Sequence, residues 1–159
     1  MHAYVMLTAK IQRPETLAKI KARTGLDGIE VYGPFDVVLE AEVDSISELY
    51  RMVTEIDKMG IIHSTTTYVV AQEGKKKATR IPKTFAYVLV DAAPGNVDKV
   101  HASVSEIKEV KKADIIFGPY DIIADIGVRN LDELNRVVRR ILSMDSVLKT
   151  CTLISFPSG

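Results

Sequence analysis

The sequence predicts an α+β protein built from two copies of one module, each ordered strand, helix, strand, strand, helix, strand. Three observations predict this class: an internal repeat, apolar runs of strand length, and helically spaced apolar residues behind capping signals. Residues 32–38 (YGPFDVV) recur as residues 117–123 (FGPYDII). The offset is 118 − 33 = 85, and residues 31–70 match residues 116–155 at 12 of 40 positions without a gap.

The repeat sets the expected domain organisation. We expect one module over residues 1–70, a second over residues 84–157, and a linker over residues 71–83. The linker is polar and basic and carries Gly74 and Pro82, which is typical of a solvated connector.

The strands are expected from short apolar runs and from the turns between them. Each Gly-Pro segment marks a hairpin turn between two β-rich runs. The expected strands are residues 3–9, 29–32, 37–43 and 64–70 in the first copy, and 85–90, 115–117, 122–128 and 149–155 in the second.

The helices are expected from caps and periodicity. The first helix of copy one begins near Pro14, which suits a first helical turn, and Asn96 is a plausible N-cap in copy two. The second helices follow Ser45-x-x-Glu48 and Asn130-x-x-Glu133, the spacing of a capping box.

The order βαββαβ predicts a ferredoxin-like fold, with a four-stranded antiparallel sheet and both helices on one face. The other sheet face has a mixed composition and needs a second layer or water. Two copies in one chain offer such a layer, so we expect the sheets to pack as an internal pseudo-dimer.

Composition excludes several classes of protein. The chain of 159 residues is 47% hydrophobic and carries 21 Lys plus Arg against 21 Asp plus Glu. This zero balance argues against a protein that mainly coats phosphate backbones, so direct DNA binding is doubtful. The single cysteine excludes an intramolecular disulfide and a cysteine-rich zinc site. No bilayer-length apolar run or signal-like start is present, so we expect a cytoplasmic protein without a membrane anchor.

The hairpin motif, the amphipathic helix after it and the Thr-x-Thr strand together resemble the effector-binding domain of Lrp/AsnC transcription regulators, called the RAM domain. The resemblance covers nearly the whole chain, twice. It implies a non-enzymatic small-molecule-binding module in transcriptional or metabolic regulation. Its implied partners are an amino-acid effector, further copies of the chain in a homo-oligomer, and a full-length Lrp/AsnC regulator. No cofactor or metal is implied.

Carried over residue by residue, the resemblance places ligand-binding positions at both turns and both last strands. The glycines are expected to supply a positive φ. The aspartates are expected either to bind a ligand ammonium or to bond turn amides. The threonines share a strand face and serve either as donors to a carboxylate or as strand formers. These positions are Gly33, Phe35, Asp36, Thr65 and Thr67 in copy one, and Gly118, Tyr120, Asp121, Thr150 and Thr152 in copy two.

Two features depart from the family pattern. Typical members carry a DNA-binding helix-turn-helix segment before this module, whereas the first strand here is expected at residue 3, so we expect no such segment. Pro34 and Pro119 stand where the family usually has a polar residue, and proline removes a backbone N–H donor.

Two other functions remain open at this stage. An architectural or nucleic-acid-associated protein would use the basic linker residues 75–77 and Arg80. A small enzyme of the dimeric α/β-barrel type usually places a His or Arg between its sheets, yet no histidine falls inside an expected strand. A copper site would need His63 together with Cys151, Met144 or Met59.

Overall fold

The computed structural model describes residues 1–11, 14–77 and 84–155. The chain divides into two compact units, which are Met1–Val69 and Val70–Gly159. Within the described residues, no helix has the length and apolar character needed to cross a membrane.

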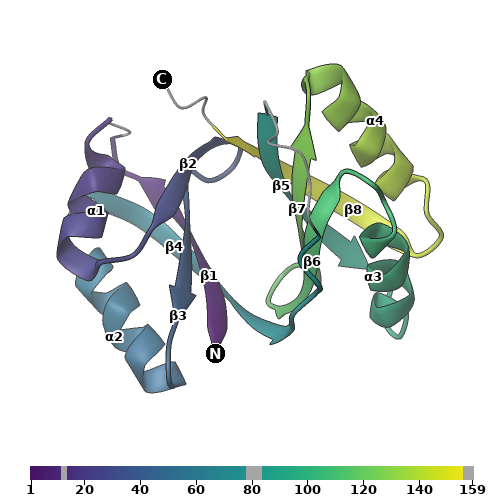
Figure 1. Ribbon diagram of the computed structural model, residues 1–159. Coiled ribbons are helices and arrows are strands. Elements are labelled where there is room, and N and C mark those ends of the chain that lie inside the picture. Colours follow the sequence, from purple (N-terminus) through teal and green to yellow (C-terminus); the bar gives the residue numbers. More distant parts are fainter. Residues whose placement is uncertain (12–13, 78–83, 156–159) are drawn as a thin grey trace. The chain divides into compact units, whose positions relative to one another are not determined.

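The first unit has the expected element order (Figure 1). Its last strand continues past the unit boundary by a few residues. The elements are β1 (His2–Ala9), α1 (Thr16–Thr24), β2 (Gly28–Tyr32), β3 (Val37–Glu42), α2 (Ile46–Asp57) and β4 (Ile62–Gln72).

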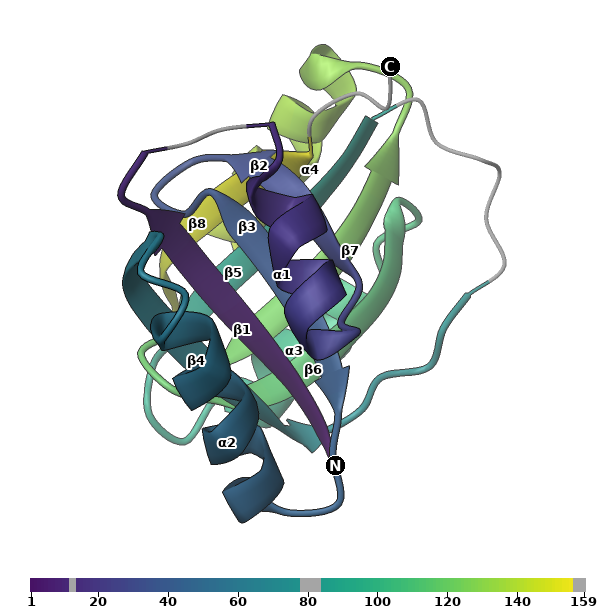
Figure 2. The ribbon, with the colours of Figure 1, turned by 90° about the vertical axis from the view of Figure 1, so that its left-hand side faces the viewer.

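The four strands of the first unit form an antiparallel sheet in the order β2-β3-β1-β4. The central strand β1 pairs Ala3 with Ala41 on one side and Val5 with Thr67 on the other. Both helices lie across the same face of this sheet (Figure 2). On that face Val5 and Leu7 pack with Ile20 of α1 and Leu49 of α2 in one core.

The second unit repeats this architecture with its own strands and helices. Its elements are β5 (Thr84–Ala92), α3 (Val97–Ser105), β6 (Val110–Phe117), β7 (Ile122–Val128), α4 (Leu131–Leu142) and β8 (Val147–Ser155).

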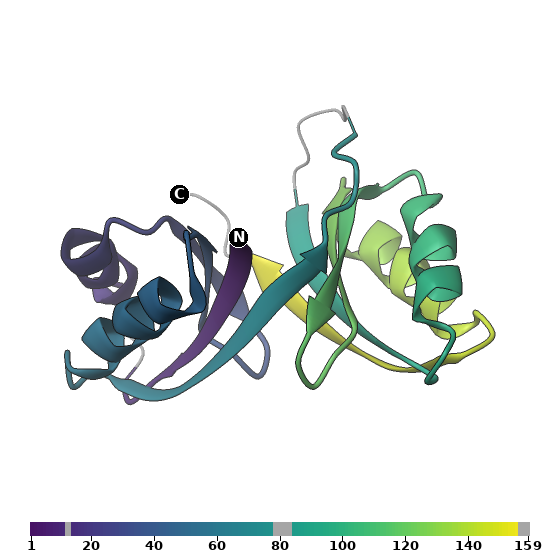
Figure 3. The ribbon, with the colours of Figure 1, turned by 90° about the horizontal axis from the view of Figure 1, so that it is seen from below.

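The second sheet is antiparallel in the order β6-β7-β5-β8, the counterpart of the first. Val88 and Val90 of β5 pack with Val104 of α3 and Leu134 of α4, so both helices cover one face (Figure 3). Side chains alternate along a strand, so Leu89 and Asp91 belong to the opposite face.

The predicted fold class, tandem ferredoxin-like modules of α+β type, is confirmed in both units. The packing of the two sheets as a pseudo-dimer stays a prediction, as do the predicted domain bounds. One expectation is wrong: β1 and β4 begin earlier than their apolar runs, so His2 and His63 lie inside strands. Ladder pairing with a neighbouring strand, which hydropathy does not report, extends these strands.

The second helix of each unit begins at the predicted cap. The Ser45 hydroxyl accepts the Glu48 amide at 3.1 Å, and Asn130 Oδ1 accepts the Glu133 amide at 2.9 Å. These bonds satisfy amide donors that have no partner inside the helix. Asn96 also occupies the N-cap position of α3, but its side chain makes no capping hydrogen bond.

We predict that Asn130→Ala lowers the free energy of unfolding by about 1 kcal/mol, because the Glu133 amide loses its acceptor. Asn130→Asp retains an acceptor oxygen and is expected to stay close to wild type. Urea unfolding followed by far-ultraviolet circular dichroism measures both. Equal destabilisation by the two substitutions would contradict the capping role.

Candidate functional site

An aspartate anchors each hairpin turn to the end of the unit's first strand. In the first unit Asp36 Oδ2 accepts the Ala9 amide at 2.8 Å. In the second unit Asp121 Oδ2 accepts the Ala92 amide at 2.9 Å. Ala9 and Ala92 follow a register shift at the same place in β1 and β5. The carboxylates therefore satisfy amides that the sheet ladder leaves unpaired, rather than amides of their own turns.

Backbone bonds complete the same anchor in both copies. The amides of Asp36 and Asp121 donate to the carbonyls of Leu7 and Val90, at 2.8 and 3.0 Å. The turn glycines have the predicted positive φ, 141° at Gly33 and 153° at Gly118. These predicted site residues therefore have a structural role that the sequence did not separate from ligand binding.

The second unit gathers charged side chains beside its turn, on the sheet face opposite the helices. Register pairs Asp91 with Lys149 and Leu89 with Cys151, so these four share that face. Lys149 Nζ lies 5.3 Å from the centre of the Tyr120 ring, within cation–π range. The Asp121 carboxyl lies close enough to Asp91 to affect its ionisation. We call Asp91, Tyr120, Asp121 and Lys149 the hairpin site.

Burial and neighbouring charges change the ionisation of this group. Burial raises the pKa of Asp91, and the adjoining Asp121 carboxyl raises it further by hydrogen bond and charge, while Lys149 opposes the shift. Burial also raises the pKa of Tyr120, with smaller contributions from Cys151 and Asp91. Burial alone raises the pKa of the Cys151 thiol. The site thus places Asp91, whose pKa is raised, beside the Asp121 carboxyl and the Lys149 ammonium group.

The first unit lacks these charges at the matching positions. The anchors align Ala9 with Ala92, so Thr8 corresponds to Asp91, and the offset of 85 aligns Ser64 with Lys149. Thr8 and Ser64 are paired in register and joined by a hydroxyl–hydroxyl hydrogen bond. The two copies therefore share the scaffold of the turn but differ in the charge placed on it.

The predicted threonines lie on the other sheet face. Thr65 and Thr67 pair with Leu7 and Val5, which are residues of the helix-covered core. Thr150 and Thr152 likewise pair with Val90 and Val88. Directly paired residues share a face, so all four threonines point to the helix side and are separated from the hairpin site. Phe35, the counterpart of Tyr120, is half-buried.

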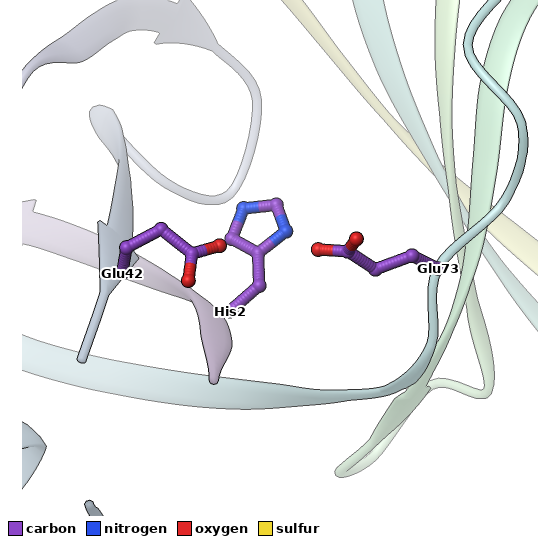
Figure 4. Close-up of side chains that lie close together, drawn as sticks. All are labelled: His2, Glu42 and Glu73. Carbon is purple, nitrogen blue, oxygen red and sulfur yellow. The ribbon is translucent and has the colours of Figure 1, made fainter. Parts of the chain in front are cut away.

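His2 contacts carboxylates within the first unit. Its Nε2 lies 3.6 Å from Glu40 Oε2, and the residue is 8% exposed. Register pairs His2 with Glu42, whose Oε2 lies 3.5 Å from the Met1 amino group. Figure 4 shows His2 and Glu42; Glu73, also drawn there, belongs to the second unit. Of the residues considered for copper, Met59 and Met144 pack against the cores of their own units.

The segment after β4 docks on the second unit, unlike the solvated connector expected there. The Gly74 amide donates to Asp114 Oδ1 at 2.8 Å, and the Lys77 amide to the Lys111 carbonyl at 2.8 Å. A Cβ at Gly74 would lie 2.0 Å from the Ala113 carbonyl oxygen, so only glycine fits. Residues 78–83 of the expected linker, with Arg80, lie outside the described residues.

Lys77 has a structural role. Its Nζ donates to the carbonyls of Ser105 and Ile107, both at 2.9 Å, and so caps the end of α3. The docked segment, α3 and β6 enclose a cavity of about 490 Å³. His101 lines this cavity, with Nε2 at 2.7 Å from the Ala113 carbonyl oxygen at the helix–sheet contact.

Sequence reasoning missed Asp91 and Lys149. Both sit at ends of strands that hydropathy describes only as apolar runs. A signal was available, because the repeat aligns a charged pair with two small hydroxyl residues. Only the register of β5 and β8 shows that these positions are adjacent.

We predict that Asp121→Ala lowers the free energy of unfolding by about 1–3 kcal/mol, because the Ala92 amide loses a charged acceptor. Asp121→Asn keeps an oxygen acceptor and is expected to lose less. Thermal or urea unfolding measures the difference. An unchanged stability of Asp121→Ala would contradict the anchoring role.

We also predict a pH dependence that originates in Asp91. Its folded-state pKa lies above the ordinary value of 3.8. Between these two pKa values, the folded chain therefore binds more protons than the unfolded chain. This group's contribution to stability therefore falls as pH rises through that window. Asp91→Asn removes the titration, so the difference in Tm between this variant and wild type is expected to shift in favour of the variant as pH is raised from about 3 to 7. Asp98→Asn, an exposed position on α3, is the control, and parallel curves for wild type and Asp91→Asn would contradict the account.

Comparisons with known proteins bear on this site. Residues 85–158 match the family model of the Lrp/AsnC ligand binding domain. An uncharacterized HTH-type transcriptional regulator of Pyrococcus abyssi is 31% identical over 70 residues, which are 43% of this chain and 44% of the relative. Another from Pyrococcus furiosus is 23% identical over 111 residues, 70% of this chain and 71% of the relative.

The architecture of the whole chain also has a solved counterpart. The siroheme decarboxylase NirDL superposes over 98% of this chain and 70% of its own, with a TM-score of 0.72 and 10% identity, a likeness of fold alone. The match to the P. abyssi regulator spans less than half of that relative's length. The family-model match lies in the second half of the chain and includes its hairpin motif, so this half is similar to the Lrp/AsnC ligand binding domain, in agreement with the resemblance seen in the sequence.

Proposed function

We propose that the chain is a non-enzymatic regulatory module that binds a small zwitterion, an amino acid, at the hairpin site of its second unit. One observation carries the proposal: the Lys149 ammonium and the Asp91–Asp121 carboxyl pair lie on one sheet face, beside the Tyr120 ring. An amino acid presents the complementary pair of charges on adjacent atoms.

Each group has a distinct part in this proposal. Lys149 pairs with the ligand carboxylate, and the carboxyl pair accepts the ligand ammonium. The incoming cation favours the ionised form of Asp91. The Tyr120 ring provides an apolar surface for the ligand side chain.

The proposal revises the predicted ligand residues. Gly118 and Asp121 keep the turn in place, and Asp121 keeps one oxygen on the Ala92 amide, next to Asp91. The threonines of β4 and β8 are not part of the proposed contact, because their face is covered by helices. The first copy has a neutral Thr8–Ser64 pair, so the proposal places one site in each chain, not two.

The similarity of the second half to the Lrp/AsnC ligand binding domain, and the regulators among the relatives, support a regulatory rather than a catalytic role. The mechanism we propose is linkage, in which the ligand stabilises whichever assembly binds it better. That assembly is a homo-oligomer of this chain or a complex with a full-length regulator of the same family. A cytoplasmic location is part of the same proposal.

A thermal-shift screen of the common amino acids tests the proposal. A ligand at about a hundred times its Kd adds roughly 2.7 kcal/mol. For a chain of this size that raises Tm by several degrees, at about 2–4 °C per kcal/mol. We predict that the shift disappears in the double variant Asp91→Thr plus Lys149→Ser, which carries the first copy's residues.

The control is Lys99→Ser, which removes an exposed lysine of α3 in the same unit. It is expected to keep the wild-type shift. Each variant is compared with its own ligand-free Tm, so a change in basal stability does not affect the result. A shift that survives the double variant places the ligand elsewhere, and the absence of a shift with every amino acid rejects an amino-acid ligand.

A further inference from the structure

A second feature of the second unit lies on its helical side, separate from the hairpin site. A groove of about 270 Å³ runs between the turn after α3 and the outer side of α4. Its apolar floor contains Ile107 and Val137. Its rim carries four cations and two carboxylates: Lys108, Arg129, Arg136, Arg140, Glu109 and Glu133.

We call this feature the basic groove, because its positive charges outnumber its negative charges. Arg129 Nε lies 2.9 Å from Glu133 Oε2, so one carboxylate is neutralised by one guanidinium. The hydrogen bond and charge of Arg129 accordingly hold the pKa of Glu133 below its usual range. Across the part of the chain that the structure describes, Lys108, Arg136 and Arg140 form no ion pair. With four cations against two carboxylates, the rim carries an excess of two positive charges.

The first copy carries carboxylates at two of the positions where the second has arginines. At the offset of 85, Glu55 stands for Arg140 and Asp44 for Arg129. Glu55 forms an ion pair with Arg23 at 3.0 Å, which ties α2 to the end of α1. In the second copy, Lys108 and Arg140 line the groove between the corresponding helices. A cation, Arg140, thus stands where the first copy has the carboxylate Glu55, and an anion bound between Arg140 and Lys108 would stabilise both.

We propose that the basic groove binds phosphate groups, at least two in each ligand. Guanidinium groups bind phosphate oxygens through paired N–H donors, and Arg136 and Arg140 lie one helical turn apart on the same side of α4. Spacing of one turn suits adjacent phosphates rather than a single carboxylate. The shared chemistry is a diphosphate-like anion, supplied either by a free nucleotide or by a nucleic-acid backbone.

The test measures binding of two probes to the full chain. Inorganic pyrophosphate is titrated by calorimetry, and a labelled oligonucleotide duplex by fluorescence anisotropy at two salt concentrations. The groove variant is Arg129→Asp plus Arg140→Glu, which installs the first copy's residues. The control variant is Lys19→Glu plus Lys99→Asp, which makes the same change in net charge on two exposed helix residues outside the groove.

We expect affinity to fall at least tenfold in the groove variant and to stay within about twofold in the control. Pyrophosphate binding alone assigns a free diphosphate ligand, while duplex binding that falls steeply with salt assigns the nucleic-acid backbone. Arg140→Gln, which adds no new charge, is expected to weaken binding in the same direction and guards against a folding defect. Equal losses in groove and control variants, or no binding of either probe to wild type, overturn the proposal.

Discussion

A hydrogen bond between a turn aspartate and a strand-end amide anchors the hairpin turn of each module to its sheet. β1 and β5 each shift register near their last residue, which leaves an amide without a ladder partner. Asp36 and Asp121 accept hydrogen bonds from these amides and so fix the hairpin turn against the end of the central strand. Because the anchor is the same in both copies, the residues around it can differ between the copies, and so serve different functions, without a change of fold.

That freedom accounts for the contrast between the two copies. The second copy carries an aspartate and a lysine where the first has a threonine and a serine. It also has Arg140 on α4 where α2 has Glu55, the carboxylate paired with Arg23. The first copy thus neutralises its surface internally, whereas the second leaves charges that a ligand can complete. We therefore assign both proposed sites to the second unit.

Repeat, caps and turn chemistry were enough to predict the fold. Ser45 and Asn130 cap their helices as their spacing indicates, and Gly33 and Gly118 adopt the expected positive φ. The site was predicted only in part. Local pattern places Asp121 and Tyr120 at the turn, but strand register decides that Asp91 and Lys149 join them and that the threonines do not. The docking of Gly74 and Lys77 depends on distant carbonyl groups, which no local pattern reports.

The central claim is that one chain holds one amino acid, in its second unit only. Equilibrium dialysis of the full chain against an equimolar mixture of the common amino acids, followed by amino-acid analysis of the excess retained, measures this most directly. The account predicts close to one mole of a single amino acid per mole of chain at saturation. Two moles per chain would show that the neutral first copy also binds, and no retained excess would show that the hairpin site does not hold a zwitterion.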